Sequence, residues 1–257
     1  MKIFSWNVNS VRVRESHLAK LLKKLHPDVV CLQETKVTNA QFPKKLFSEL
    51  GYHIYINGIT SYNGVAIFSK RKAEKVSCIP FCDKKDARHI SITLRKYKIH
   101  SIYIPAGGET PDININEKFR HKLDFVDEIN TRIGDKKNQI LCGDFNIAPR
   151  EDDVWSHKSL LNVVSHTKIE VSKLDLVFEK GYWFDCVRKF CNPPNNVYTW
   201  WSYRSPDFTK NNRGRRLDHI WVSSNLEKKI VAASIIKDAR KMTKPSDHVP
   251  IIVEIKN

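Results

Sequence analysis

The segment QILCGDFNIAP, residues 139–149, constrains the fold of this chain more than any other part of it. Its apolar start is typical of a buried strand, and Gly143 would let the chain bend sharply where that strand ends. Asp144 and Asn146 stand at alternate positions, so in extended backbone both would face the same side of the sheet. Buried polar groups cost free energy unless they find partners. By itself the segment fits a structural Asx turn as well as a functional site.

Apolar runs recur along the chain and alternate with helical patterns. We predict strands at residues 2–8, 28–32, 139–142, 216–222 and 248–255. The short β-prone runs between residues 52 and 104 have the spacing of an antiparallel sheet. We predict helices at residues 15–25 and 42–50, a long helix opened by Thr110 and Pro111 and ended by Gly134, and a short one from Ser172 to Gly181. Residues 150–171 are predicted to form a long loop with helical turns.

This order of elements predicts one α/β (α+β) domain that spans residues 1–257. The length suits one large domain or two small ones, with a sizeable core. The sequence contains no internal repeat, low-complexity tract or linker, which favours one domain. We expect two sheets packed face to face with helices outside. Composition and periodicity support the mixture of α and β, but they do not by themselves establish the two sheets.

The charge of the chain favours a polyanionic partner. Lys and Arg number 44 against 28 Asp and Glu, which gives a formal net charge of +16 spread over the whole chain. A solvated basic face that aids solubility is the simpler alternative. The six cysteines include no CxxC pair, so we expect no zinc site. The sequence begins without a signal-like apolar core and has no run of transmembrane length, so we expect a reduced, cytoplasmic protein with no membrane partner.

Polar side chains stand at the ends of several predicted strands. They are Asn7, Glu34, Asp144, Asp218, and the adjacent pair Asp247 and His248. Each alone could be a turn, a cap or a surface salt bridge, but together they could converge at one rim of a sheet. Carboxylates held close together repel one another unless a cation lies among them, and hard oxygen ligands suit Mg²⁺ or Mn²⁺ rather than zinc. A basic protein with such a site is typical of a metal-assisted phosphoesterase that acts on nucleic acid.

Seven segments carry a resemblance to a known family. They are WNVNSVR (6–12), LQETK (32–36), YIPAGG (103–108), GDFNIAP (143–149), YTWWSYR (198–204), NRGRRLDHIWVS (212–223) and KPSDHVP (244–250). Over essentially its whole length the chain resembles the exonuclease III family of abasic-site (AP) endonucleases, within the endonuclease/exonuclease/phosphatase superfamily. The resemblance implies a four-layered sandwich of two mixed β-sheets between helices, with the active site at one end.

The resemblance implies a divalent metal site and names its residues. Glu34 matches the acidic ligand of the ion, Asn7 lies beside it, and Asp247 completes the surroundings. Asp144 and Asn146 match positions that are sometimes assigned to a second metal. The cofactor implied is Mg²⁺, with Mn²⁺ as a substitute.

The same resemblance implies the catalytic roles. Asp144 matches the residue that activates the attacking water, and Asn146 matches the partner that holds the phosphate. His248 matches the histidine that contacts the scissile phosphate, and Asp218 matches its orienting carboxylate. A carboxylate on one imidazole nitrogen favours the cationic form and keeps the other nitrogen on the phosphate. Tyr103 matches the active-site tyrosine, which argues against the branch that resembles DNase I.

The resemblance also implies the contacts to DNA. Trp200 and Leu217 match the walls of a pocket for a flipped, base-less sugar, although Trp200 could instead be ordinary core. Arg12, Arg88 and Arg213 match basic positions near the DNA backbone, and a solvated arginine is the alternative for each. The chain departs from the family pattern in three places, which are Ser10, where glycine is usual, Ala106, where Asn or Gln is common, and His219, where members vary.

The function implied is DNA repair. The expected reaction is metal-dependent hydrolysis of the phosphodiester 5′ to an abasic site, with 3′→5′ exonuclease or 3′-end-cleaning activity on duplex DNA. The expected partner is double-stranded DNA with abasic sites or blocked 3′ ends, bound by a monomer. Another phosphodiesterase or phosphatase of the superfamily, acting on RNA, a phosphoinositide or a sphingolipid, is the alternative. A non-catalytic DNA-binding protein is a third reading, which the intact set of acidic residues and His248 disfavours.

Overall fold

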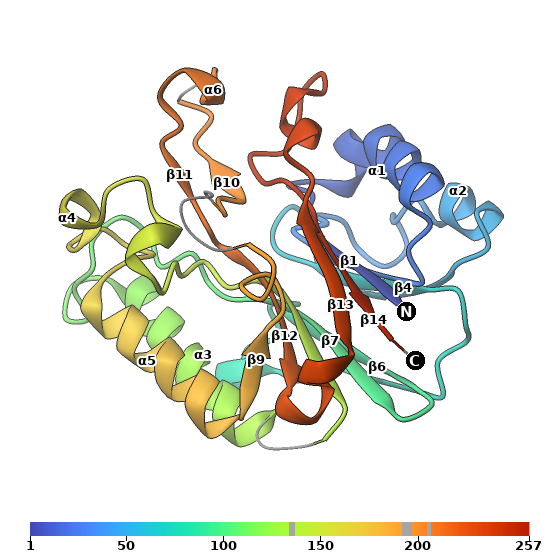
Figure 1. The fold of residues 1–257 in the computed structure, drawn as a ribbon, viewed down its shortest axis with the longest axis horizontal. Helices are drawn as coiled ribbons and strands as arrows, with labels where there is room; N and C mark the ends of the chain where they lie inside the picture. Colours follow the sequence, from blue (N-terminus) through green and yellow to red (C-terminus); the bar gives the residue numbers. More distant parts are fainter. Residues whose placement is uncertain (134–136, 192–196, 205–206, 257) are drawn as a thin grey trace.

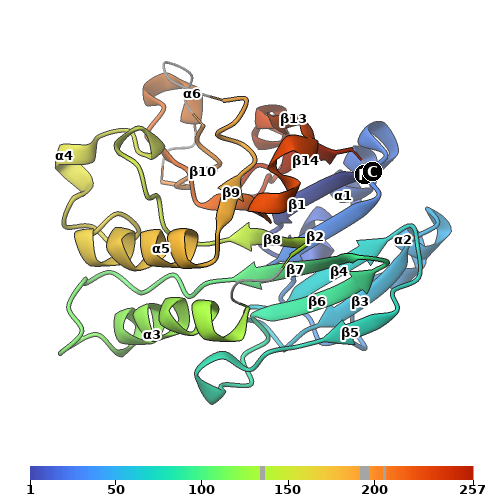
Figure 2. The same cartoon turned by 60° about the horizontal axis from the view of Figure 1, so that its bottom comes forward.

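The fold consists of two six-stranded sheets packed face to face, with helices over both outer faces (Figures 1 and 2). The computed structural model describes residues 1–133, 137–191, 197–204 and 207–256. The predicted class, α/β in four layers, is therefore confirmed. No helix among these described residues is long and apolar enough to cross a membrane.

The first sheet has the strand order β13-β14-β1-β2-β4-β3. Its strands are β1 (Lys2–Asn7), β2 (Val29–Gln33), β3 (His53–Asn57), β4 (Val65–Ser69), β13 (Ile230–Ile235) and β14 (Ile251–Ile255). Only β1 and β2 pair in parallel. The outer face is covered by α1 (Val11–Leu25) and α2 (Lys44–Glu49), which pack on aromatic side chains such as Phe4, Trp6 and Phe68.

The second sheet has the order β5-β6-β7-β8-β12-β9. Its strands are β5 (Lys75–Ser77), β6 (His89–Leu94), β7 (Tyr97–Tyr103), β8 (Gln139–Asp144), β9 (Trp183–Asp185) and β12 (Asp218–Ser223). Its outer face is covered by α3 (Glu117–Arg132) and α5 (Lys168–Lys180), which lie side by side in both views. The remaining elements are short: β10 (Trp200–Trp201), β11 (Gly214–Arg215), α4 (His157–Leu160), α6 (Phe208–Asn211) and the 3₁₀ turns Phe81–Asp83, Glu151–Asp153, Ser224–Lys229 and Lys237–Lys241.

The alternation of side chains along β8 builds two layers of core at once. Ile140 and Cys142 face inward, into the layer between the two sheets, where Cys31 also lies. Leu141 points to the opposite side and packs beneath α3 and α5. Because successive residues of a strand face opposite sides, an uninterrupted apolar run indicates a strand buried on both faces. Both cysteines are fully buried and free, and act as small apolar side chains.

Several predictions from the sequence need correction. The strands between residues 52 and 104 do not form one sheet, because β3 and β4 join the first sheet while β5, β6 and β7 join the second. The long helix begins at Glu117 and is capped by Asn116, whose side chain accepts from the backbone of Lys118 and Phe119, so Thr110 and Pro111 do not open it. The predicted end of this helix at Gly134 lies outside the described residues.

The helix predicted to start at Ser172 begins earlier, at Lys168, within the segment that we expected to be a loop. It has a capping box in which the Thr167 side chain accepts from the backbone of Glu170 while the Glu170 carboxylate accepts from the backbone of Thr167.

Candidate active site

Register brings the predicted strand-end residues to one rim of the molecule. Asp144 at the end of β8 pairs in register with Tyr103 at the end of the parallel strand β7. It also pairs with Asp218 at the start of the antiparallel strand β12. From the first sheet, β1 ends at Asn7 and β2 is followed directly by Glu34. The two sheets therefore contribute polar groups to the same edge of the interlayer.

Gly143 allows the close approach of two strands on which this rim depends. Strand β8 continues through Gly143 to Asp144, so the predicted bend at Gly143 is wrong. Its φ is +155°, and a Cβ at this position would lie 1.9 Å from the carbonyl oxygen of Ile102 on β7. Any side chain would force β7 and β8 apart, and would thereby separate Tyr103 from Asp144.

The side chain of Asn7 joins two carboxylates. Its Nδ2 donates to Oε1 of Glu34 at 2.8 Å and to Oδ2 of Asp144 at 2.9 Å. The Tyr103 hydroxyl donates to the same oxygen of Glu34 at 3.0 Å, and Lys36 Nζ lies 2.8 Å from the other oxygen. The pKa of Tyr103 lies well above its usual value, chiefly through burial and then through the nearby Glu34 charge. Lys36 is part of the LQETK segment, but no role was predicted for it.

Asp144 is a buried carboxylate held in a crowded setting. Burial raises its pKa to about 7, and the neighbouring Asp218 adds to this rise while His248 opposes it. Oδ1 of Asp144 accepts from the backbone N–H of Asn146 at 2.9 Å, and Oδ2 accepts from Asn146 Nδ2 at 3.2 Å. Asn146 has a φ of +52°. This local geometry is that of an Asx turn, so the turn and the site turn out to be the same structure.

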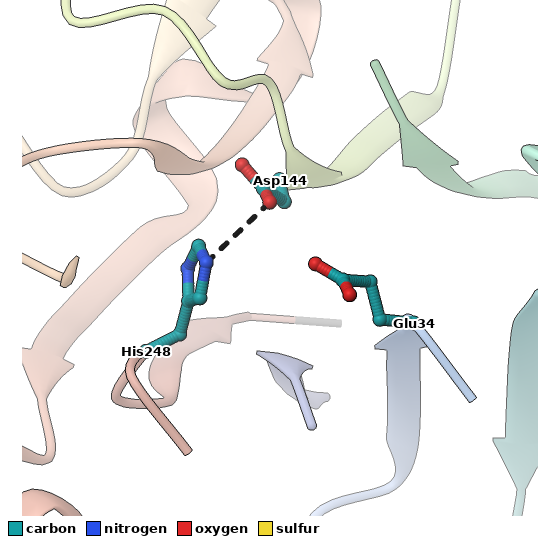
Figure 3. Close-up of side chains that lie close together, drawn as sticks. All are labelled: Glu34, Asp144 and His248. Atoms are coloured by element: carbon teal, nitrogen blue, oxygen red, sulfur yellow. Dashed lines mark ion pairs between the residues drawn. The ribbon is translucent and has the colours of Figure 1, made fainter. Parts of the chain in front are cut away.

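His248 lies between two carboxylates from the second sheet. Its Nδ1 is 2.8 Å from Oδ2 of Asp218, and its Nε2 is 3.6 Å from Oδ2 of Asp144 (Figure 3). Burial by itself would lower the pKa of His248, but the charges of Asp218 and Asp144 outweigh it and raise the pKa to about 10. The imidazole is therefore a buried cation at neutral pH.

Glu34, Asp144 and His248 point toward one another from three separate elements (Figure 3). One potential ligand atom from each lies within 4.8 Å of the other two, which is the spacing of a metal site. Because His248 is cationic, the oxygen atoms of Glu34 and Asp144 are the better metal ligands. Oxygen ligands suit a hard divalent cation. The raised pKa of Asp144 fits this conclusion, since a cation nearby would relieve the cost of its buried charge. The acidic cluster could thus hold a metal ion.

The structure does not bring Asp247 into this cluster. Its Oδ1 accepts from Asn9 Nδ2 at 2.9 Å, and its Oδ2 accepts from the indole N–H of Trp200 at 2.9 Å. Asn7, as placed, presents its amide nitrogen rather than its oxygen to the carboxylates. The metal roles that the resemblance implied for Asp247 and Asn7 therefore remain predictions. No role was predicted for Asn9, although it lies within the WNVNSVR segment.

The chain is similar to known proteins over essentially its whole length. Residues 4–248 match the model of the Endonuclease/Exonuclease/phosphatase family. The chain belongs to this family. It is 31% identical to exodeoxyribonuclease III of Haemophilus influenzae over 275 residues, covering all of both chains. The solved AP endonuclease from Archaeoglobus fulgidus superposes on the chain with a TM-score of 0.93 and is 30% identical to it. The 3′ phosphatase NExo from Neisseria, solved with a product DNA hairpin, superposes with a TM-score of 0.88 and is 28% identical. Each match covers all of both chains.

In this member of the family, Trp200 and Leu217 come together beside the rim. Leu217 is buried in a small apolar cluster with Ala148 and Val154, and the half-buried Trp200 packs against that cluster. The bond from the Trp200 indole to Asp247 links this wall to the polar rim. Trp200 is thus not ordinary core.

The three predicted arginines differ in their surroundings. Arg12 is exposed at the start of α1. Arg88 pairs with Asp86 at 2.6 Å and stacks over the ring of Tyr103 at 4.8 Å. Arg213 stacks over Trp155 at 4.7 Å, and Trp155 is 36% exposed. No role was predicted for Trp155, because it falls in residues 150–171, for which the sequence predicted only a loop with helical turns.

The departures from the family pattern have visible local effects. Ser10 has a φ of +91°, which explains why glycine is favoured there, because only glycine adopts this region freely. His219 is buried, stacks on Phe145 with ring centroids 4.7 Å apart, and donates a hydrogen bond from Nε2 to the Ile147 carbonyl oxygen at 3.0 Å. Burial lowers the pKa of His219 to about 3, so it is a neutral core residue. Ala106 is exposed at the position where a longer polar side chain is common.

A buried ion pair outside the predicted set supports the rim from below. Lys122 on α3 and Glu170 on α5 are both fully buried, with Nζ 2.5 Å from Oε1. The same Nζ donates to the carbonyl oxygens of Asn146 at 2.8 Å and Ala106 at 3.3 Å. The pair therefore ties both loops that follow β7 and β8 to the outer helices. A lysine within an apolar helical stripe was the only signal for it in the sequence.

Proposed function

We propose that this chain is a DNA repair nuclease that hydrolyses the phosphodiester 5′ to an abasic site and also processes 3′ ends of duplex DNA. Its relatives are named exodeoxyribonuclease III, DNA-(apurinic or apyrimidinic site) endonuclease and 3′ phosphatase, which supports both activities. The observation that carries the proposal is the buried row Asp144–His248–Asp218 beside Glu34. Since this rim draws on both sheets, we propose that residues 1–257 act as one nuclease domain.

The proposal includes a divalent ion, Mg²⁺ or Mn²⁺, held mainly by Glu34 and Asp144. Asn7, Asn146 and Asp247 would complete its surroundings, through bound water where their own oxygens are already engaged. When bound, the ion would offset negative charge on the phosphoryl oxygens of the substrate. The preference for these metals rests on the oxygen-rich donor set of the rim.

Each remaining group has a role that its contacts support. Asp144, whose Oδ2 lies 3.6 Å from Nε2 of His248, would accept the proton of the attacking water. His248, held as a cation by Asp218, would face the phosphate and stabilise the charge that develops on it. Asn146, whose Nδ2 donates to the Ile104 carbonyl and to Asp144, would exchange one of these acceptors for the phosphate. Tyr103 would keep Glu34 in place through their 3.0 Å hydrogen bond.

DNA itself would be held by shape and by charge. Trp200 and Leu217 would wall the pocket for the extruded base-less sugar, whose extrusion costs less than that of a paired nucleotide. Arg12, Arg88 and Arg213 would lie along the backbone, in keeping with the net charge of +16. We further propose a monomer in the cytoplasm, a setting that the six free cysteines support.

A cleavage assay tests the proposal. A duplex with one abasic analogue should be nicked on its 5′ side with Mg²⁺ and left intact with EDTA. Asp144→Asn should lower the rate by about 10²–10⁴-fold without loss of DNA binding, while the exposed control Asp124→Asn should be unaffected. Parallel reactions on a blunt end, a blocked 3′ end, RNA and a phosphoinositide separate the activities. A metal-dependent reaction on RNA or lipid without any nick at the abasic site would refute the proposal.

A further inference from the structure

A cavity lies at the end of the sandwich opposite to the active site. Its volume is about 380 Å³, and it opens where the two sheets part, between the start of β2 and end of β4 on one side and the β6–β7 hairpin on the other. Val29, Leu94 and Tyr97 form its apolar floor. Strand β7 runs from Tyr97 at this cavity to Tyr103 at the catalytic rim, and six steps of extended strand span about 20 Å. The two sites therefore cannot share one phosphate group.

Cations dominate the rim of this cavity. Lys70, Arg71, Arg95 and Lys96 line it, against the single carboxylate of Asp28. Asp28 is already engaged, because its Oδ2 accepts from the backbone of Lys2 at 2.7 Å.

Among the described residues, two of these cations, Arg71 and Arg95, are uncommitted, while Lys96 Nζ lies 5.3 Å from the centroid of the Tyr97 ring. Lys70 donates to the Leu50 carbonyl at 2.5 Å and stacks over a tyrosine ring. Within the part of the chain that the structure describes, Arg71, Arg95 and Lys96 make no ion pair and no side-chain hydrogen bond. The carboxylate of nearby Glu74 accepts from the backbone of Arg95 at 3.1 Å, which fixes the hairpin turn.

A buried hydroxyl is a second, independent sign of a missing ligand. Tyr97 is 6% exposed, and its hydroxyl is buried without a hydrogen-bond partner among the described residues. A buried polar atom with no partner costs free energy, so it is rare unless something else satisfies it. Tyr97 is one of the residues that line the cavity.

We propose that this cavity is a second ligand site, which binds a small phosphate ester such as a nucleoside monophosphate. Arg71, Arg95 and Lys96 would hold the phosphate, since guanidinium groups match its geometry, and the apolar floor would take the organic part. The volume falls within the range of small-molecule pockets. The site does not depend on the reaction proposed for the opposite rim, because none of its residues contributes to that rim.

Calorimetric titration of the full chain in EDTA with deoxyadenosine 5′-monophosphate, inorganic phosphate and deoxyadenosine tests the site. We expect the nucleotide to bind more tightly than either fragment. Arg71→Ala/Arg95→Ala should weaken this binding by at least about tenfold, and Tyr97→Phe should weaken it several-fold while keeping the ring. The control Lys20→Ala/Lys24→Ala, which removes the same charge from the exposed face of α1, should bind like the wild type.

Three results would overturn this inference. The first is equal affinity in the Arg71→Ala/Arg95→Ala variant and the control. The second is loss of all nucleotide binding in a catalytic-rim variant, His248→Ala, with the cavity intact. The third is inorganic phosphate that binds as tightly as the nucleotide. The Arg71→Ala/Arg95→Ala variant should cleave abasic DNA normally, which shows that it is folded and separates this inference from the proposed reaction.

Discussion

His248 and Asp218 form a buried ion pair, in which Nδ1 of the His248 ring lies 2.8 Å from Oδ2 of Asp218. The other oxygen of Asp218 is buried and has no partner among the described residues, so the histidine receives the full influence of this carboxylate. The backbone N–H of Asp218 donates to the Thr199 hydroxyl at 3.1 Å, which fixes the carboxylate at the start of β12. Asp218 thus orients the His248 ring and, together with Asp144, keeps it protonated.

The pH dependence of cleavage should reveal this pair. The pKa of His248 is raised from its ordinary 6.5 to about 10, so the cation is fully present below pH 6.5 and is lost only as the pH rises through about 10. In the Asp218→Asn variant the charge that offsets burial is removed, so the pKa of His248 falls. Each pH unit by which this pKa lies below the assay pH lowers the fraction of cationic His248 about tenfold. We expect kcat/KM of Asp218→Asn to decline at a lower pH than that of the wild type. Identical alkaline limbs in the two profiles would contradict this role of Asp218.

Metal binding should be visible as thermal stabilisation, without any substrate. An ion that binds only the folded chain adds about 2.7 kcal/mol at a hundred times its Kd, which is several degrees in Tm for a domain of this size. Glu34→Gln should lose most of the Mg²⁺-induced rise, because it removes one of the two best-placed carboxylates. Glu254→Gln on the exposed side of β14 is the matched control. Equal Mg²⁺-induced shifts in both variants would place the ion elsewhere.

The Arg213–Trp155 stack should contribute to the salt dependence of DNA binding. If Arg213 neutralises one phosphate, Arg213→Ala should reduce the slope of log K against log salt by about 0.9 in magnitude. Trp155→Ala should weaken binding as well, because it removes the surface on which the guanidinium rests. Fluorescence anisotropy in EDTA between low and moderate salt measures both effects. Arg132→Ala, an exposed arginine near the end of α3, should leave the slope unchanged.

The buried pair Lys122–Glu170 should show strong energetic coupling. Lys122→Met leaves the Glu170 carboxylate without its cation, which costs about 3–5 kcal/mol for a buried pair. Lys122→Met/Glu170→Gln should be less destabilised than the sum of the two single variants, as measured by urea denaturation. Additive free energies of unfolding would show that the two charges act independently. Because Lys122 also holds the carbonyl of Asn146, both Lys122 variants should lower kcat more than they raise KM.

The composition of the catalytic rim was predictable from the sequence, because the relevant signals are local. A carboxylate next to an apolar run marks a strand end wherever it occurs. Glu34 and Asp144 follow such runs, and Asp218 precedes one. The segments that resemble the family then predicted roles for His248 and Tyr103. The structure places both within hydrogen-bonding distance of acidic partners. The helix start at Glu117 was missed because Asn116 competes with Thr110 and Pro111 as a cap, and only packing of the flanking chain decides between them.

The sequence by itself determined the class of fold, the strands buried on both faces and the residue types of the site. Tertiary structure alone decided that residues 52–104 divide between two sheets, since periodicity records which face of a strand is buried but not which sheet buries it. It also decided that Gly143 serves the contact of β7 with β8 instead of a bend, and that both oxygens of Asp247 are taken up by Asn9 and Trp200. Contacts between residues so far apart in the chain depend on strand register and layer packing, for which no local pattern exists.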